Sequence, residues 1–294
     1  MDDIQRVRRI WEALDLPGII DVHTHFMPRP VMDKVWRYFD TKGPLTGREW
    51  PITYRTNEAR RVSTLRRFGV RWFTSLVYPH KPQMADWLNQ WAAQFALTTP
   101  DCIPTATFYP EPGADAYVTA ALRRGARVFK AHLQVGDYDP NDPLLDGVWG
   151  TLQDAGIPIV IHCGSGPAVG AHTGPEPIRS LLHRYPRLAL IIAHLGMPEY
   201  IEFLDICLRH ANVRLDTTMA FTTFAEELMP VPAAVLRRLP DTGDRILFGS
   251  DFPNIPYPYV QAMTALTDLA GIDDDWLRDV LYRNAAGLFG LTPH

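Results

Sequence analysis

Eight short apolar runs alternate with segments of helical periodicity along this 294-residue chain, and no other feature limits its fold as strongly. Each run has about the length of a strand that is buried on both faces. The runs are residues 18–22, 70–77, 103–108, 127–131, 157–161, 188–193, 213–215 and 246–249. The helical segments are residues 57–68, 83–97, 115–124, 144–155, 176–185, 199–210 and 259–270. Such alternation indicates a parallel sheet covered by helices.

Eight strand–helix units in one chain predict an α/β fold, specifically a closed (β/α)8 TIM barrel, for which about 250 residues is typical. The alternative is an open doubly wound sheet, which would carry a glycine-rich phosphate turn after an early strand. Here the first strand leads into His23-Thr24-His25, which contains no glycine, so the barrel is favoured. Because no linker or low-complexity stretch divides the chain, we expect a single domain over residues 1–294.

Two parts of the chain lie outside the eight units. Residues 1–16 are expected to form an extra N-terminal helix, and residues 26–55 form a long insertion after the first strand. So many aromatic side chains in a connection indicate a packed lid or a subunit contact, which makes a homodimer one expectation. These aromatic residues are Phe26, Trp36, Tyr38, Phe39, Trp50 and Tyr54. On the following helical segment, a second group is interpreted as a solvated face: Arg60, Arg61, Arg66 and Arg67.

The composition excludes several classes of protein. A hydrophobic fraction of 46% and a charged fraction of 21% are typical of a folded protein, and a net charge of −4 argues against a dedicated nucleic-acid binder. The sequence contains no apolar run of about 20 residues, the length of a membrane span, and no secretion signal is evident. We therefore expect a cytoplasmic protein whose partner is a small molecule, with no binding to nucleic acid or membrane.

Five residues of types that bind metals stand at or just after the ends of predicted strands. His23 and His25 close the first, His162 the fifth, His194 the sixth and Asp251 the eighth. A barrel would bring them together, because the C-terminal ends of its strands open on one mouth. Any one of these histidines alone would more often be structural, but five such groups on one rim need a charge to organise them. Three imidazoles and a carboxylate suit one divalent ion, with zinc expected and manganese, cobalt or iron as alternatives.

Four segments resemble the successive motifs of the amidohydrolase superfamily. They are Asp21-Val22-His23-Thr24-His25, Ile161-His162-Cys163-Gly164, Ala193-His194-Leu195-Gly196 and Gly249-Ser250-Asp251-Phe252-Pro253. The branch they resemble most is the amidohydrolase-related branch, which is similar to aminocarboxymuconate-semialdehyde decarboxylase, and the resemblance covers residues 18–290. It implies a mononuclear site in which His23, His25 and His162 bind the metal. Asp251 would be a ligand or a close neighbour, and His194 the acid–base residue.

The role of Lys130, near the end of the fourth predicted strand, stays open. In binuclear relatives a carboxylated lysine at that place bridges two metals, and the histidine that corresponds to His194 binds the second metal. The interpretation that we favour is a plain ammonium group that pairs with Asp251 or with a substrate oxygen. The role of Asp21 is also open: it is either an acceptor that fixes a ligand imidazole or a buried structural carboxylate. The expected substrate-binding residues are Lys130, His132, Tyr78 and Asn254.

These residues predict a metal-dependent hydrolase, in which a metal-activated water cleaves an amide, ester or lactone bond of a small molecule. His194 or Asp251 would take the proton and return it to the leaving group. The alternative on the same scaffold is a non-oxidative decarboxylase or hydratase of a small carboxylic acid. A third alternative is a binding module whose metal site has decayed, against which the intact ligand set argues.

Hydrolysis is favoured over decarboxylation because a decarboxylase needs cations that hold the carboxylate of its substrate. Few cations follow the predicted strands. The candidates are Arg29, Arg48, Arg55, Lys81 and Lys130.

Overall fold

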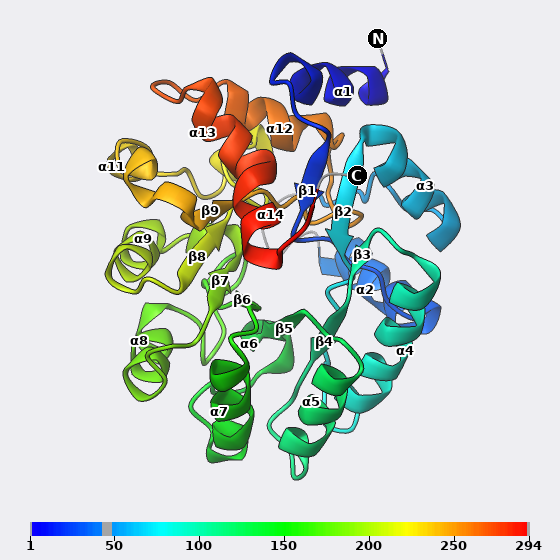
Figure 1. Ribbon diagram of the computed structural model, residues 1–294, viewed down its shortest axis with the longest axis vertical. Coiled ribbons are helices and arrows are strands. Elements are labelled where there is room, and N and C mark those ends of the chain that lie inside the picture. Colours follow the sequence, from blue (N-terminus) through cyan, green and yellow to red (C-terminus); the bar gives the residue numbers. More distant parts are fainter. Residues whose placement is uncertain (1, 43–48, 293–294) are drawn as a thin grey trace. The chain divides into compact units, whose positions relative to one another are not determined.

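The computed structural model describes residues 2–42 and 49–292. Contacts between Cα atoms group the chain into two compact units (Figure 1). The first unit is Met1–Phe73 with Asp216–His294, and the second unit is Thr74–Leu215. None of the helices in the described part of the chain combines the length and the apolar character that a bilayer crossing requires.

The second unit is built on parallel strands that pair in chain order. β4 (Thr105–Thr107), β5 (Val128–His132), β6 (Ile159–His162), β7 (Leu190–Ile192) and β8 (Val213–Asp216) follow one another in the sheet. All four residues of β6 are buried, which explains why the first three, Ile159–Ile161, are apolar without alternation. The predicted run 103–108 is divided into β3 (Cys102–Ile103) and β4 at Pro104, which has no N–H to donate to a ladder. Each of the eight predicted runs contains a strand.

The expected helices of the second unit are present. Figure 1 shows the longer ones on one side of strands β4 to β8. They are α4 (Ala85–Thr98), α5 (Ala114–Arg123), α7 (Asp146–Ala155), α8 (Pro175–Arg184) and α9 (Tyr200–Arg209). Shorter turns follow the strands or precede these helices: α6 (Leu133–Gly136), η2 (Pro143–Leu145) and η3 (Ala193–Gly196).

The first unit begins with the predicted N-terminal helix. α1 (Asp3–Ala13) starts after Asp2, whose side chain accepts a hydrogen bond from the Gln5 N–H. β1 (Ile19–Asp21) pairs in parallel with β2 (Val70–Thr74), and α3 (Glu58–Phe68) connects to β2. The insertion contains a helix that the sequence analysis did not predict, α2 (Arg29–Lys42). After residue 216 come α10 (Thr223–Glu226), α11 (Ala233–Leu236), η4 (Leu239–Arg245), β9 (Ile246–Leu247), α12 (Val260–Thr267), α13 (Asp274–Arg278), η5 (Asp279–Arg283) and α14 (Asn284–Phe289).

Gly69 permits the tight turn between α3 and β2. Its φ of +87° lies in the left-handed region, and a Cβ atom there would lie 2.6 Å from the ring of Trp11. The indole of Trp11 donates to the Phe68 carbonyl oxygen at 2.9 Å. The glycine therefore allows α1 to pack directly against this turn.

One prediction about α3 is wrong. Arg60, Arg66 and Arg67 are exposed as expected, but Arg61 is only 3% exposed. The helical period explains the difference, because Arg61 lies one and two turns from the buried Leu65 and Phe68 and so shares their face.

The fully buried carboxyl group of Asp21 ties the end of β1 to the segment after β9. Its Oδ1 accepts from the backbone N–H of His23 and of Ser250, each at 3.2 Å. Its Oδ2 accepts from the Ser250 hydroxyl at 2.6 Å and the Tyr259 hydroxyl at 2.8 Å. Burial raises the pKa of Asp21 to about 7. These contacts support the structural interpretation of Asp21, because its carboxyl group bonds to none of the imidazoles that the structure describes.

Replacing the Asp21 carboxyl group should destabilise the fold, and the loss should be larger when more of its hydrogen-bond acceptors are removed. We expect Asp21→Ala to lower the free energy of unfolding by about 3 kcal/mol, because buried N–H and O–H donors lose their acceptors. Asp21→Asn should cost much less, since its amide oxygen can still accept from the two backbone N–H groups. Urea unfolding of the metal-free variants measures both values, and equal losses for the two variants would contradict the assignment.

Candidate metal centre

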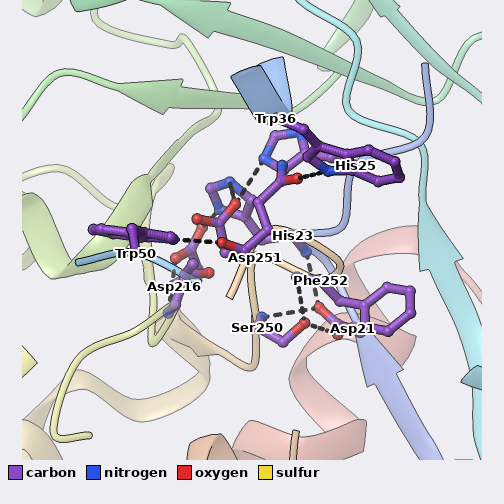
Figure 2. Close-up of polar contacts among 11 residues, drawn as sticks. Asp21, His23, His25, Trp36, Trp50, Asp216, Ser250, Asp251 and Phe252 are labelled. Atoms are coloured by element: carbon purple, nitrogen blue, oxygen red, sulfur yellow. Dashed lines mark hydrogen bonds and ion pairs between the residues drawn. The ribbon is translucent and has the colours of Figure 1, made fainter. Parts of the chain in front are cut away.

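Three side chains of the first unit bring ligand-type atoms within 4.8 Å of one another: His23, His25 and Asp251 (Figure 2). The distance from His25 Nε2 to Asp251 Oδ1 is 2.9 Å, and from His23 Nε2 to the same oxygen 4.0 Å. The two imidazole rings lie 5.1 Å apart at 72°. Both histidines are buried, whereas the Asp251 side chain is 13% exposed. The cluster is therefore enclosed but open at the carboxylate.

The backbone holds this carboxylate beside the two histidines. The chain after β9 runs alongside the continuation of β1: the His25 N–H donates to the Phe252 carbonyl at 2.7 Å, and the Asp251 N–H to the His23 carbonyl at 2.8 Å. Asp251 has a φ of +68°, a region that few residues other than glycine adopt. A non-glycine residue persists there only when the surrounding structure holds it, and these hydrogen bonds do so.

Asp216, at the end of β8, orients the ring of His23. Its Oδ2 lies 2.8 Å from His23 Nδ1, and both side chains are buried. A carboxylate at Nδ1 fixes the proton on that nitrogen, so Nε2 keeps its lone pair for a metal. The sequence analysis missed this role, although the position of Asp216 directly after the seventh apolar run was an available signal.

The donor set fits a divalent metal ion. Imidazole nitrogen and carboxylate oxygen are ligands of zinc, manganese, cobalt and iron. The Asp216 carboxylate behind His23 is the usual support of a metal-binding histidine. The Asp251 oxygen and the two Nε2 atoms face one another, as they would around a shared cation.

A second group of predicted residues clusters within the second unit. The rings of His132 and His162 stack 4.1 Å apart at 10°, and His194 lies edge-on to His162 at 4.8 Å. Tyr78 lies 4.9 Å from His132. His162 Nε2 is 3.0 Å from the Gly166 carbonyl oxygen, which can only accept a hydrogen bond. In the neutral ring Nδ1 therefore keeps the lone pair.

The remaining predicted residues occupy distinct places. Lys130 is fully buried on β5, and its carbonyl oxygen accepts from Thr107 Oγ1 at 2.7 Å. His132 Nδ1 accepts from the Val135 N–H at the start of α6. His194 is half-buried and has a φ of +57°.

Asn254 belongs to the first unit and is 2% exposed; its Oδ1 accepts from the indole of Trp36 at 3.1 Å. The structure thus assembles His23, His25 and Asp251 in the first unit and Tyr78, His132, His162 and His194 in the second. Joint action of the two groups stays a prediction.

Of the five cations considered for a substrate carboxylate, Lys130 is fully buried, and the other four are exposed, paired or outside the described residues. The Arg29 side chain is 93% exposed, and Lys81 is exposed as well. Arg55 lies 2.7 Å from Asp40, whose carboxylate raises the pKa of the guanidinium. Arg48 lies outside the described residues.

The chain is similar to known proteins in sequence and in fold. A family model described as Amidohydrolase matches residues 20–291. No curated protein sequence matches the chain. An uncharacterised TIM-barrel protein from Bordetella bronchiseptica superposes with a TM-score of 0.73 and 21% identity, covering 93% of this chain and 99% of that one. This similarity confirms the predicted α/β TIM-barrel fold.

Two further structures carry names of enzymes. One is a 5-carboxyvanillate decarboxylase from Novosphingobium aromaticivorans, complexed with manganese and 4-hydroxy-3-methoxy-5-nitrobenzoic acid; its TM-score is 0.62 at 15% identity, with 94% of this chain and 97% of that one covered. The other is a probable 2-pyrone-4,6-dicarboxylic acid hydrolase from Acinetobacter baumannii with citric acid bound; its TM-score is 0.61 at 16% identity, with 93% and 99% covered. At these identities the likeness concerns the fold.

The contact between Asp216 and His23 yields a test of the cluster. We expect Asp216→Asn to weaken divalent-metal binding about 10- to 100-fold, because the neutral amide no longer supports the basicity and orientation of the imidazole. Competition with a chelator measures the affinity. Asp241→Asn, at an exposed carboxylate, is the matched control. Equal affinities of the two variants would remove Asp216 from the site.

Proposed function

The chain belongs to the amidohydrolase family, and on that premise we propose that it is a metal-dependent hydrolase that cleaves an amide, ester or lactone bond of a small molecule. The observation that carries this proposal is the convergence of His23, His25 and Asp251, with His23 oriented by Asp216. The likeness to a protein described as a hydrolase of a pyrone dicarboxylic acid supports the same reaction class.

We propose that His23, His25, His162 and Asp251 hold one divalent ion. His23 would bind through Nε2, because Asp216 occupies Nδ1, and His162 through Nδ1, because the Gly166 carbonyl occupies Nε2. Zinc is the proposed ion, with manganese, cobalt and iron as alternatives; the manganese in the decarboxylase structure supports manganese as the first of these. When bound, such an ion lowers the pKa of a water molecule and polarises a carbonyl oxygen.

Two residues of the chain are proposed to move protons. The Asp251 carboxylate lies against His25 Nε2 and is 13% exposed, so it is placed to accept a proton from the attacking water. His194, half-buried on the turn after β7, would return a proton to the leaving group.

Four residues are proposed to contact the substrate: Lys130, His132, Tyr78 and Asn254. His132 would use Nε2, because its Nδ1 accepts from the Val135 N–H. Asn254 would use its side-chain NH2 group, because Oδ1 accepts from Trp36.

A second candidate is a non-oxidative decarboxylase or hydratase of a small carboxylic acid. The observation that favours it is the likeness to 5-carboxyvanillate decarboxylase, whose TM-score nearly equals that of the hydrolase neighbour. Hydrolysis remains the first candidate, because Arg29 and Lys81 are exposed and Arg55 is paired with Asp40, which leaves Lys130 as the one buried candidate among the described cations considered for a substrate carboxylate. A cytoplasmic location, a homodimer, a single domain and the lack of nucleic-acid or membrane partners stay proposals.

The metal content per chain tests the ligand set directly. We expect about one ion per chain by plasma mass spectrometry after purification without chelator, and we expect His162→Ala to lose the metal while it keeps a cooperative unfolding transition. Two ions per chain would instead favour Lys130 as a carboxylated bridge and His194 as a ligand. Absence of metal even after reconstitution would overturn the proposal in favour of a binding module.

The role of His194 has a separate signature. We expect His194→Asn to lower kcat about 10²- to 10⁴-fold on any ester or lactone that the protein turns over, with unchanged metal content, because the change removes a proton donor and no ligand. His183→Asn, at an exposed histidine of α8, is the control. Loss of metal in His194→Asn would instead make His194 a ligand.

A further inference from the structure

The insertion after β1 is fastened along the loop that carries Asp251. We call α2 together with residues 49–56 the first-loop segment, and residues 251–257 the Asp251 loop. The indole N–H of Trp36 donates to Asn254 Oδ1 at 3.1 Å, and that of Trp50 to the Asn254 carbonyl oxygen at 2.7 Å. The Thr53 N–H donates to the Ile255 carbonyl oxygen at 2.9 Å. Two tryptophans therefore donate hydrogen bonds to one residue, one to its side-chain oxygen and one to its backbone carbonyl oxygen.

Asn254 connects these two tryptophans to the candidate ligand Asp251. Its N–H donates to the Asp251 carbonyl oxygen at 2.8 Å and closes the turn that follows the carboxylate. Asp251 itself has the unusual φ of +68°, which requires support from its surroundings. In the view of Figure 2, Trp36 and Trp50 lie on two sides of Asp251.

Packing fixes the direction of the Trp50 donor. Its ring stacks on Phe39 at 5.1 Å and 29°, and meets Phe224 edge-on at 4.8 Å. A ring held on two sides presents its N–H in one direction, at a lower entropic cost than a flexible side chain.

Arginines hold the ring of Trp36. The guanidinium groups of Arg55 and Arg61 lie 5.5 and 5.3 Å from the ring centre, and Arg61 also lies 5.4 Å from the ring of Phe26. Among the described residues, the buried Nε and Nη1 of Arg61 have no hydrogen-bond partner. Burial of a cation without such a partner is costly. Its contacts with the two rings, together with the charges of Glu58 and Asp33, offset part of this cost. The buried position of Arg61 thus serves the placement of Trp36.

We propose that Trp36, Trp50 and Asn254 are positioning residues that hold the Asp251 carboxylate at His23 and His25 for metal binding. The first-loop segment is then a built part of the metal centre. This inference rests on the proposed function, because it assigns these residues to the metal site proposed above.

Phenylalanine substitutions test the two donors, because they remove the indole N–H and keep an aromatic ring. We expect Trp36→Phe and Trp50→Phe each to weaken Co²⁺ binding about 10-fold or more in chelator competition, as other outer supports of metal ligands do. We also expect a shifted visible absorption spectrum of the Co²⁺-loaded protein, because the carboxylate changes its geometry. Trp87→Phe, on α4 and 46% exposed, is the matched control.

The Co²⁺ spectrum separates positioning from a merely structural role. A variant that loses thermal stability but keeps the wild-type spectrum and affinity would overturn the inference while the proposed function stands. Wild-type protein that takes up no Co²⁺ would overturn both.

Asn254→Ala provides a second route if Trp36→Phe does not fold, because it removes the Oδ1 acceptor of the Trp36 indole, and we expect it to weaken Co²⁺ binding to the same extent. Where Trp36→Phe does fold, we expect the metal affinity of the double variant to equal that of either single variant, since both changes break the same hydrogen bond. Fully additive losses would contradict the proposed bond as the cause.

Discussion

The buried carboxyl group of Asp21 is the interaction on which the arrangement of the first unit depends. Its two oxygens accept from the N–H and hydroxyl of Ser250, from the Tyr259 hydroxyl and from the His23 N–H. These bonds join the end of β1 to a segment more than 200 residues later in the chain. The candidate metal-binding side chains extend from this junction, with His23 and His25 on one side and Asp251 on the other. A buried carboxyl group is stable only when it accepts hydrogen bonds. Here the donors belong to the two chain segments that carry the candidate ligands, so these hydrogen bonds also hold the segments together.

In two of the candidate ligands, His23 and His162, one ring nitrogen is held by an acceptor, which leaves the other nitrogen to face a metal. His23 is held at Nδ1 by a carboxylate and His162 at Nε2 by a backbone carbonyl, so opposite ring nitrogens keep their lone pairs. The Asp216 carboxylate and the Gly166 carbonyl each fix the tautomer of the imidazole that they contact. The carboxylate also makes its imidazole a more basic ligand. The electrostatic support is therefore concentrated on His23, beside Asp251.

The first-loop segment shows why an insertion can be rich in aromatic residues. Tyr54 lies against Phe252, and its hydroxyl accepts from the Tyr259 N–H and donates to Asp3. The segment thus links α1, α12 and the Asp251 loop through rings with fixed donors. Burial raises the pKa of Tyr54, which keeps its hydroxyl protonated as this donor. Packing of this kind supports one of the two interpretations of the insertion, that of a packed element, and it extends to the turn that presents the carboxylate.

Local patterns in the sequence determined the strands and helices, because burial on two faces and helical periodicity depend on neighbouring residues. The run that became β6 is apolar throughout, and α3 begins after Asn57 and ends at Gly69 as its capping residues dictate. The prediction for Arg61 was wrong because it rested on the charge of the residue. Arg61 lies on the buried face of α3 and is only 3% exposed.

The sequence by itself also determined near which strand ends the candidate ligands lie, since each stands within three residues after its apolar run. Only the tertiary structure decided how those side chains are supported. The partner of His23 is 193 positions away, and the acceptor of the Trp36 indole is 218 positions away. No local pattern encodes such pairs, because a hydrogen bond depends on where the folded backbone places two groups and not on their distance along the chain.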